Sequence, residues 1–173
     1  QEWCGHVYTQ WLLRGANLEE TLHSYWDGEA DRYTSIPIPT GAVFGDALPM
    51  LARGLTGSFV GRGETVTVPF VERTLDLRLA RRSPTWQTAQ LSRSHPTNRT
   101  TAVGVVGAET VRVEYGTGLW LEYWVEADGD RRLLGWQTSQ GEQAVLTGTM
   151  RTPYWTQSGR SHEGLREQLG LLP

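Results

Sequence analysis

The chain has 173 residues, enough for one domain that buries roughly 70% of the surface exposed by the unfolded chain. Its net charge is −3, and its basic residues, all of them arginine, are scattered rather than clustered, which argues against nucleic acid or an anionic membrane as a partner. The single cysteine, Cys4, excludes an internal disulfide, and no apolar run approaches the roughly 18 residues of a membrane-spanning helix.

Alternating apolar and polar residues, the pattern of β-strands, recur along most of the chain between glycine, proline, aspartate and serine residues. The expected strands are 5–13, 20–26, 32–38, 64–71, 74–81, 85–91, 101–106, 109–115, 119–127, 131–138 and 143–151. Helical signals predict two short helices, one at 47–54, begun by Asp46 and closed by Gly54, and one at about 162–169. We therefore expect one mainly β domain over residues 1–173, with a curved antiparallel sheet that forms a barrel or half-barrel.

The N-terminal part predicts a hairpin with a turn around Arg14 to Glu19. In the simplest antiparallel pairing Tyr8 faces Tyr25 and Gln10 faces His23. A polar face then contains Cys4, His6, Tyr8, Gln10, His23 and Tyr25, and an apolar face contains Val7, Trp11, Leu13, Leu22 and Trp26. Cys4 and His6 supply only two metal ligands, so we expect no metal site and interpret these residues as a polar sheet surface.

The segment from Arg81 to Thr100 has the least regular pattern, and we expect the longest loop there. It contains Asn98-Arg99-Thr100, a glycosylation sequon that we interpret as a chance match. Asp27, Glu29 and Asp31 lie beside Gly28 and are typical of a solvated turn.

Asp128-Gly129 is the strongest hairpin signal in the chain, because a two-residue type I′ turn requires positive φ at both positions. Centring the turn on this pair places Glu126 opposite Arg131, Trp124 opposite Leu133 and Tyr123 opposite Leu134. One face of the hairpin is then a core face, which contains Leu121, Tyr123, Val125, Leu134 and Trp136. The other face, here called the mixed face, contains Trp120, Glu122, Trp124, Glu126, Arg131, Leu133 and Gln137, and the next strand adds Leu146 and Met150.

Apolar bulk on both faces requires either a cover over the mixed face or a sheet that curls around a pocket. A cover is the more common arrangement, since large apolar residues pack more often than they bind ligands. In the pocket alternative, the two indoles suit an apolar, amphipathic or cationic ligand. The candidate ligand-binding residues are Trp120, Glu122, Trp124, Arg131, Leu133, Leu146 and Met150, with Glu122 and Arg131 orienting a polar end.

Common catalytic and phosphate-binding motifs are absent from the sequence, so it indicates no cofactor and no catalytic residue. Glu122 and Glu126 lie roughly 13 Å apart on an extended strand, too far for a glycosidase pair. An isomerase or hydrolase that uses His6 or His23 as an acid–base group remains the enzymatic alternative.

The segments QEWCGH, SYWDGEAD and RTPYW resemble a family of uncharacterised bacterial envelope proteins, many of them predicted lipoproteins. VGAETVRVEYG, followed by LEYWVEADGDRRLLGW, is similar to the closing half of periplasmic sheet proteins related to the lipoprotein-carrier half-barrel. The resemblance implies an exported protein, in the envelope or secreted, with a curved antiparallel sheet and no assigned activity. It also implies further strands before QEWCGH, which makes this chain the C-terminal portion of a longer protein.

Three functions follow in order of preference. The first is a non-enzymatic envelope protein that binds a lipid-like molecule or a peptide segment on the concave face of its sheet. The second is the acid–base enzyme, and the third is a structural module without a ligand.

Overall fold

The computed structural model describes residues 7–26, 28–29, 31–55, 59–157 and 159–171. The chain divides into two compact units. One comprises residues 1–48 and 67–89, and the other comprises residues 49–66 and 90–173. The fold is mainly β, as predicted, with one large sheet and one small sheet.

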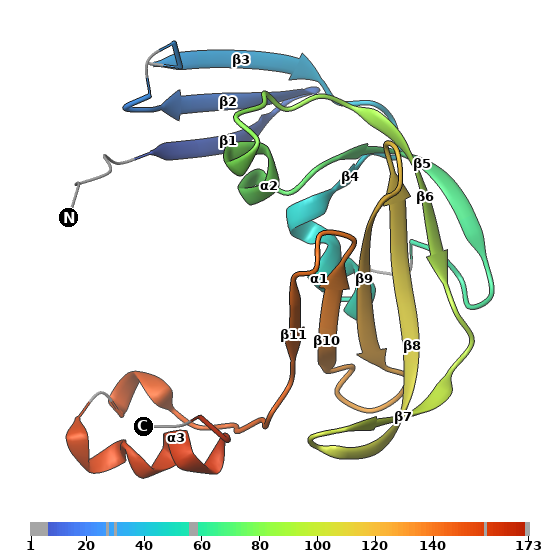
Figure 1. Ribbon diagram of the computed structural model, residues 1–173, viewed down its shortest axis with the longest axis vertical. Helices are drawn as coiled ribbons and strands as arrows, with labels where there is room; N and C mark the ends of the chain where they lie inside the picture. Colours follow the sequence, from blue (N-terminus) through green and yellow to red (C-terminus); the bar gives the residue numbers. More distant parts are fainter. Residues whose placement is uncertain (1–6, 27, 30, 56–58, 158, 172–173) are drawn as a thin grey trace. The chain divides into compact units, whose positions relative to one another are not determined.

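The large sheet has eight strands and is strongly curled into a half-barrel (Figure 1). Its strand order is β11-β10-β9-β8-β6-β5-β4, and β7 also pairs with β8. The described pairs of β7 to β11 are antiparallel, whereas β4 and β5 are parallel. The strands are β4 (Val43–Phe44), β5 (Thr65–Val71), β6 (Gln87–Arg93), β7 (Thr97–Thr101), β8 (Gly104–Tyr115), β9 (Leu119–Glu126), β10 (Leu133–Thr138) and β11 (Gln143–Val145).

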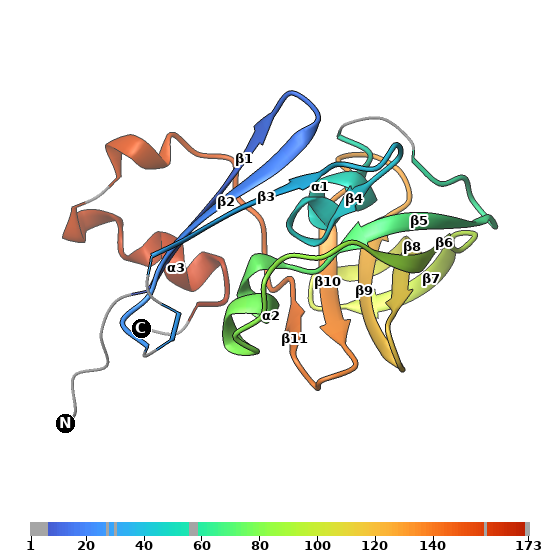
Figure 2. The same ribbon diagram turned by 90° about the horizontal axis from the view of Figure 1, so that it is seen from above.

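The small sheet is an antiparallel meander of β1 (Tyr8–Arg14), β2 (Asn17–His23) and β3 (Arg32–Pro37). Figure 2 shows these three strands side by side. Tyr8 pairs with His23 rather than with Tyr25, so the predicted pairing is wrong by two residues. The reason is the turn, which is much shorter than expected and leaves Arg14 directly opposite Asn17. A shift of two residues keeps each side chain on its face, so Tyr8, Gln10 and His23 still share one surface.

The described residues contain three α-helices: α1 (Leu48–Arg53) and α2 (Thr74–Leu79) lie between strands, and α3 (Gly164–Gln168) follows the last strand. Short 3₁₀ turns occupy Gly45–Ala47, Tyr154–Thr156 and Arg160–His162. The first and last α-helices confirm the two predicted ones, and Gly54 ends α1 with φ of +74°. Of the helices in the described ranges, none combines the length and apolar character that a bilayer crossing requires.

The segment 74–81 was expected as a strand and is instead the helix α2. Leu75, Leu77 and Leu79 alternate with polar residues, which is the strand pattern, yet only Leu77 is buried. In the first turn of the helix, the Asp46 carboxylate accepts hydrogen bonds from the backbone N–H and the hydroxyl of Thr74, and Arg73 pairs with Asp76 at 2.6 Å. The helix is thus stabilised by one local ion pair and one contact from a distant segment, neither of which the two-residue alternation contains.

The region around residue 100 also differs from the expected loop. Residues 87–93 and 97–101 are strands, and 104–115 is one long strand rather than two. The turn lies at Ala102-Val103, where the Thr101 hydroxyl accepts a hydrogen bond from the backbone N–H of Val103 and donates one to the carbonyl of Gly104. Gly104 takes a φ of +108°, which only glycine adopts readily.

Candidate ligand-binding site

The predicted two-faced character of β9 is confirmed. Leu121, Tyr123 and Val125 are buried on one face, as expected for a core face. The four residues of the opposite face, Trp120, Glu122, Trp124 and Glu126, are all half-buried. The mixed face is therefore neither fully buried nor fully exposed to solvent.

Arginine side chains from two other strands, β8 and β7, lie over the two indoles of the mixed face. The guanidinium carbon of Arg112, on β8, lies 4.3 Å from the ring centroid of Trp120. The corresponding carbon of Arg99, on β7, lies 3.7 Å from the ring centroid of Trp124. Both distances are those of cation–π contacts. The protein thus supplies its own cations to the indole faces that the sequence suggested for a cationic ligand.

Glu122 holds the Trp124 indole in place. Its Oε1 accepts hydrogen bonds from Nε1 of Trp124 at 2.7 Å and from Nε2 of Gln137 at 3.0 Å. Its Oε2 accepts from Arg112 at 3.3 Å. On β10, Gly135 is the cross-strand partner of Trp124, and a Cβ atom there would lie only 2.8 Å from Cε3 of the indole. The ring is therefore fixed before any ligand arrives.

A hollow of about 240 Å³, here called the Trp124 hollow, opens beside this indole. Apolar side chains of β9, β10 and the β11 region form one part of its wall, and residues of β7 and its turn form the other. The lining residues are Arg99, Thr100, Thr101, Ala102, Trp124, Leu134, Val145 and Leu146. Most of this lining is apolar, and Arg99 is its one charged residue among those that the structure describes.

The predicted binding residues separate in the structure. Trp120, Glu122 and Trp124 share the mixed face, and Leu146 lines the hollow together with Trp124. Met150 lines a different hollow, of about 380 Å³, with residues of the C-terminal segment such as Tyr154 and Leu169. Arg131 and Leu133 are not on the mixed face, because Arg131 is bound to Glu109 and Leu133 lies opposite Val125.

The predicted pairing of the 128–129 hairpin is wrong. Val125 pairs with Leu133, and after an irregularity Trp124 pairs with Gly135. The turn is wider than a two-residue turn, and Gly129 and Arg131, not Asp128, have positive φ. Leu133 therefore shares the face of Val125, which corrects its predicted place on the mixed face, whereas Leu134 is 2% exposed, as expected for a core residue, and also contributes to the wall of the Trp124 hollow.

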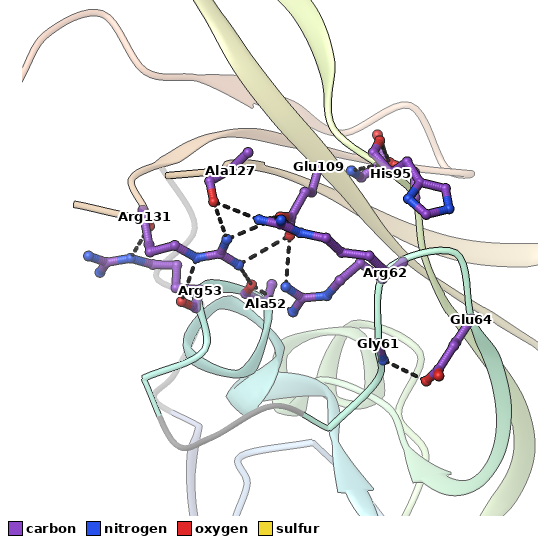
Figure 3. A network of polar contacts seen from close by, with 12 residues as sticks. Ala52, Arg53, Gly61, Arg62, Glu64, His95, Glu109, Ala127 and Arg131 are labelled. Atoms are coloured by element: carbon purple, nitrogen blue, oxygen red, sulfur yellow. Dashed lines mark hydrogen bonds and ion pairs between the residues drawn. The ribbon is translucent and has the colours of Figure 1, made fainter. Parts of the chain in front are cut away.

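Arg131 is drawn away by Glu109, which is fully buried in β8 (Figure 3). Nη1 and Nη2 of Arg131 each lie 3.2 Å from a carboxylate oxygen of Glu109. The same carboxylate accepts hydrogen bonds from Arg62 at 2.6 Å and from Arg93 at 2.8 Å. These arginines also donate to the carbonyls of Ala52 and Ala127. The cluster fixes the turn after β9 against α1, so we assign it a structural role.

The neighbouring arginines keep the carboxyl group of Glu109 in its charged form. Burial raises the pKa of its carboxyl group, but hydrogen bonds and positive charge from Arg131 and Arg62 outweigh this effect and hold the pKa below its ordinary value. The carboxylate is therefore charged at neutral pH and neutralises part of the surrounding positive charge.

The polar face of the first hairpin carries His23, whose Nδ1 lies 2.5 Å from Oδ1 of Asp31. Both side chains are largely exposed, and the Tyr8 ring lies 5.9 Å from the imidazole. Cys4 and His6 lie outside the described residues, as does Asp27. Glu29, expected in a solvated turn, is instead half-buried, and its carboxylate accepts hydrogen bonds from Arg78 at 2.6 Å and Ser24 at 2.9 Å.

Reasoning from the sequence alone did not identify Glu109 or Arg99 as important residues. Glu109 had a signal, because the alternation of Val111, Val113 and Tyr115 extends back to it and places a carboxylate on the core face. No sequence signal identified Arg99, because its position over Trp124 depends on how β7 and β9 pair with β8. Thr97, Thr100 and Thr101 favour a strand at this segment but do not define its partner.

Within the described ranges, no group of three or more histidine, cysteine, aspartate or glutamate residues is arranged to hold a metal ion. Comparisons with family models, curated proteins and solved structures find no match to this chain. The site is therefore interpreted from its own geometry.

Proposed function

We propose that the protein is a non-enzymatic binding protein whose Trp124 hollow receives the apolar part of a small amphipathic molecule. The observation that carries this proposal is the hollow itself, with a fixed indole on one side and the aliphatic side chains of Leu134, Val145 and Leu146 around it. Apolar cavities with a few polar groups at the margin are the usual form of small-molecule sites.

Rigidity of the indole supports this function. The Trp124 ring is held by Glu122 through its Nε1 and by the close approach of Gly135. A wall that is already ordered costs no further conformational entropy when a ligand binds. The hollow is thus suited to binding without rearrangement.

The size of the hollow limits the ligand. Its volume of about 240 Å³ is below the roughly 300–1,000 Å³ of sites for drug-sized molecules. A short acyl chain or a single ring fits, and a larger molecule must leave the remainder outside. Val145 is 63% exposed, so the hollow is open to solvent on that side and a longer ligand has an exit.

Titration with octanoate tests the proposal. We expect saturable shifts of the Trp124 indole N–H signal in spectra of ¹⁵N-labelled protein, with the signal assigned by its loss in Trp124→Phe. Trp120 is the internal control, because it lies on the same strand and face beneath an arginine but does not line the hollow. Its signal is expected to stay nearly constant.

Variants provide the second control. Leu146→Ser places a polar group in the wall and is expected to weaken octanoate binding about tenfold, since roughly 1.4 kcal/mol corresponds to a factor of ten. Leu79→Ser makes the same substitution at a 72% exposed site in the other unit and is expected to have no effect. If neither acyl nor aryl probes shift the Trp124 signal in the folded protein, the binding function is rejected.

We also propose a location in the bacterial envelope or outside the cell, supported by the resemblance of the QEWCGH, SYWDGEAD and RTPYW segments. Fractionation of host cells that produce the complete protein tests it. Recovery in the cytoplasmic fraction alone would reject this location and leave the binding proposal intact.

A further inference from the structure

The two arginine–indole contacts of the mixed face differ in their charge balance. Arg112, over Trp120, also bonds Glu114 at 2.7 Å and Glu122 at 3.3 Å. Its positive charge is therefore neutralised within the sheet. Arg99, over Trp124, makes no hydrogen bond or ion pair through its side chain with any residue in the described part of the chain.

The acidic residues of the mixed face are already engaged. Glu114 and Glu122 bond Arg112, and Glu126 bonds Arg132 at 2.6 Å. None of these three carboxylates is paired with Arg99, although it stands on the same face of the sheet. Arg99 is thus a cation whose side-chain N–H donors have no partner among the described residues, and it lines an apolar hollow.

We propose that Arg99 recognises an anionic oxygen group, a carboxylate or a phosphate, at the head of a molecule whose short apolar chain occupies the Trp124 hollow. This inference rests on the proposed binding function and specifies its ligand class. Arg131, which the sequence suggested for orienting a polar end, is engaged by Glu109 instead.

The chemistry of guanidinium supports this role. The group is planar, stays protonated at all relevant pH values and presents pairs of N–H donors that match carboxylate and phosphate oxygens. The cation–π contact with the indole orders the arginine side chain, and among the described residues it leaves the N–H donors without hydrogen-bond partners. Arg99 is half-buried, so the ion pair that it forms with a ligand is partly shielded from water.

Four probes with one common tail test the head-group preference: octanoate, octyl phosphate, 1-octanol and octylammonium. Titrations follow the Trp124 indole signal at low ionic strength. We expect octanoate and octyl phosphate to bind about tenfold more tightly than 1-octanol. A partly exposed charge-assisted hydrogen bond contributes a free energy of about this size to binding. Octylammonium is expected to bind most weakly, because its charge repels Arg99. The tighter of the two anions identifies the head group as a carboxylate or a phosphate ester.

Variants at Arg99 separate charge from stacking. Arg99→Gln is expected to reduce the affinity for the anionic probes to that for 1-octanol, whereas Arg99→Lys keeps part of the preference. Arg14→Gln, at a 67% exposed residue of β1, changes the net charge equally and is expected to leave all affinities unchanged. Added salt should lower the affinity for the anions and not for 1-octanol, since salt screens exposed ion pairs.

The outcomes distinguish the two proposals. Equal affinities for all four probes that Arg99→Gln does not alter would overturn the anion preference and leave the binding function standing. A folded protein whose Trp124 signal responds to none of the probes would overturn both.

Discussion

The Trp124 indole rests against Gly135 so closely that no larger residue fits at position 135. A Cβ atom there would meet Cε3 of Trp124 at 2.8 Å and the carbonyl oxygen of Ala144 at 2.6 Å. The second atom is backbone of the neighbouring strand, which cannot move aside easily. This contact gives a direct means of disturbing the hollow without altering a lining residue.

We therefore expect Gly135→Ala to destabilise the protein by about 1–3 kcal/mol, the usual cost of overpacking, and to shift the Trp124 indole signal in the free protein. Urea unfolding and ¹⁵N spectra measure the two effects. Gly164→Ala is the control, because a Cβ atom at this helical position would meet nothing within 4 Å. Equal stability of Gly135→Ala and the wild type would show that the strands around Trp124 are looser than described.

The Glu109 cluster predicts a large loss of stability on removal of one charge. Glu109→Gln keeps the size of the side chain but leaves Arg62, Arg93 and Arg131 without their shared carboxylate. Breaking a buried ion pair from one side costs about 3–5 kcal/mol. We expect a loss of this order in the free energy of unfolding, measured from urea titrations monitored by circular dichroism.

Glu114→Gln is the matched control for that change. Its carboxylate also bonds an arginine, Arg112, but its side chain is 57% exposed. Exposed pairs contribute about 0–1 kcal/mol, so we expect a change in this range. Comparable losses for Glu109→Gln and Glu114→Gln would contradict the structural role assigned to the buried cluster.

Stability is expected to fall in acid. The pKa of Glu109 is held below its ordinary value by Arg131 and Arg62 against the opposing effect of burial, and the pKa of Glu126 is lowered by its hydrogen bonds with Arg132. A carboxyl group with a lowered pKa stabilises the fold above the unfolded pKa of about 4.3, and this contribution is lost as the pH falls through the folded pKa.

Urea midpoints at pH 7, 5, 4 and 3 measure this dependence. We expect little change between pH 7 and 5 and a steep decrease below about pH 4. The Glu109→Gln variant has one of these carboxylates removed, so its decrease should be shallower. Parallel curves for the wild type and the variant would exclude Glu109 as a source of the acid sensitivity.

The helix α2 depends on a carboxylate that lies far from it in the sequence. Asp46 accepts a hydrogen bond from the backbone N–H of Thr74 at 3.0 Å and another from its hydroxyl. Asp46→Ala is expected to cost about 1 kcal/mol, as for the loss of a helix cap. Thr74→Val removes only the hydroxyl contact and should cost less. Thermal unfolding compares them, and a larger effect of Thr74→Val would contradict the importance of the backbone contact.

The mainly β fold and most strand positions follow from the sequence because the two-residue period depends on local geometry alone. The core residues of β9, Leu121, Tyr123 and Val125, were identified in this way, and the burial of each confirms it. The alternation also placed Trp120, Glu122 and Trp124 together on the other face. The alternation of Leu75, Leu77 and Leu79 was misleading, because the segment is a helix whose first turn is stabilised by contacts of Asp46 and Arg73.

Pairing between strands was much less predictable than the strands themselves. The Asp128-Gly129 signal favoured a two-residue turn, but Arg131 is bound to the buried Glu109 and takes a left-handed conformation. The resulting wider turn and the irregularity after Leu133 place Leu133 opposite Val125, on the core face, and not on the mixed face as predicted. The pairing of strands near a turn therefore depends on contacts between distant residues, which local signals do not contain.

The residue types along the chain determined by themselves that a sheet would form and that one surface of β9 would combine indoles with carboxylates. Only the tertiary structure decided that Arg99 lies over Trp124 and that Arg131 does not join it. The physical reason is that period-two geometry assigns a side chain to a face, whereas the partner that it meets depends on hydrogen-bonded strand pairs and buried charges from remote segments.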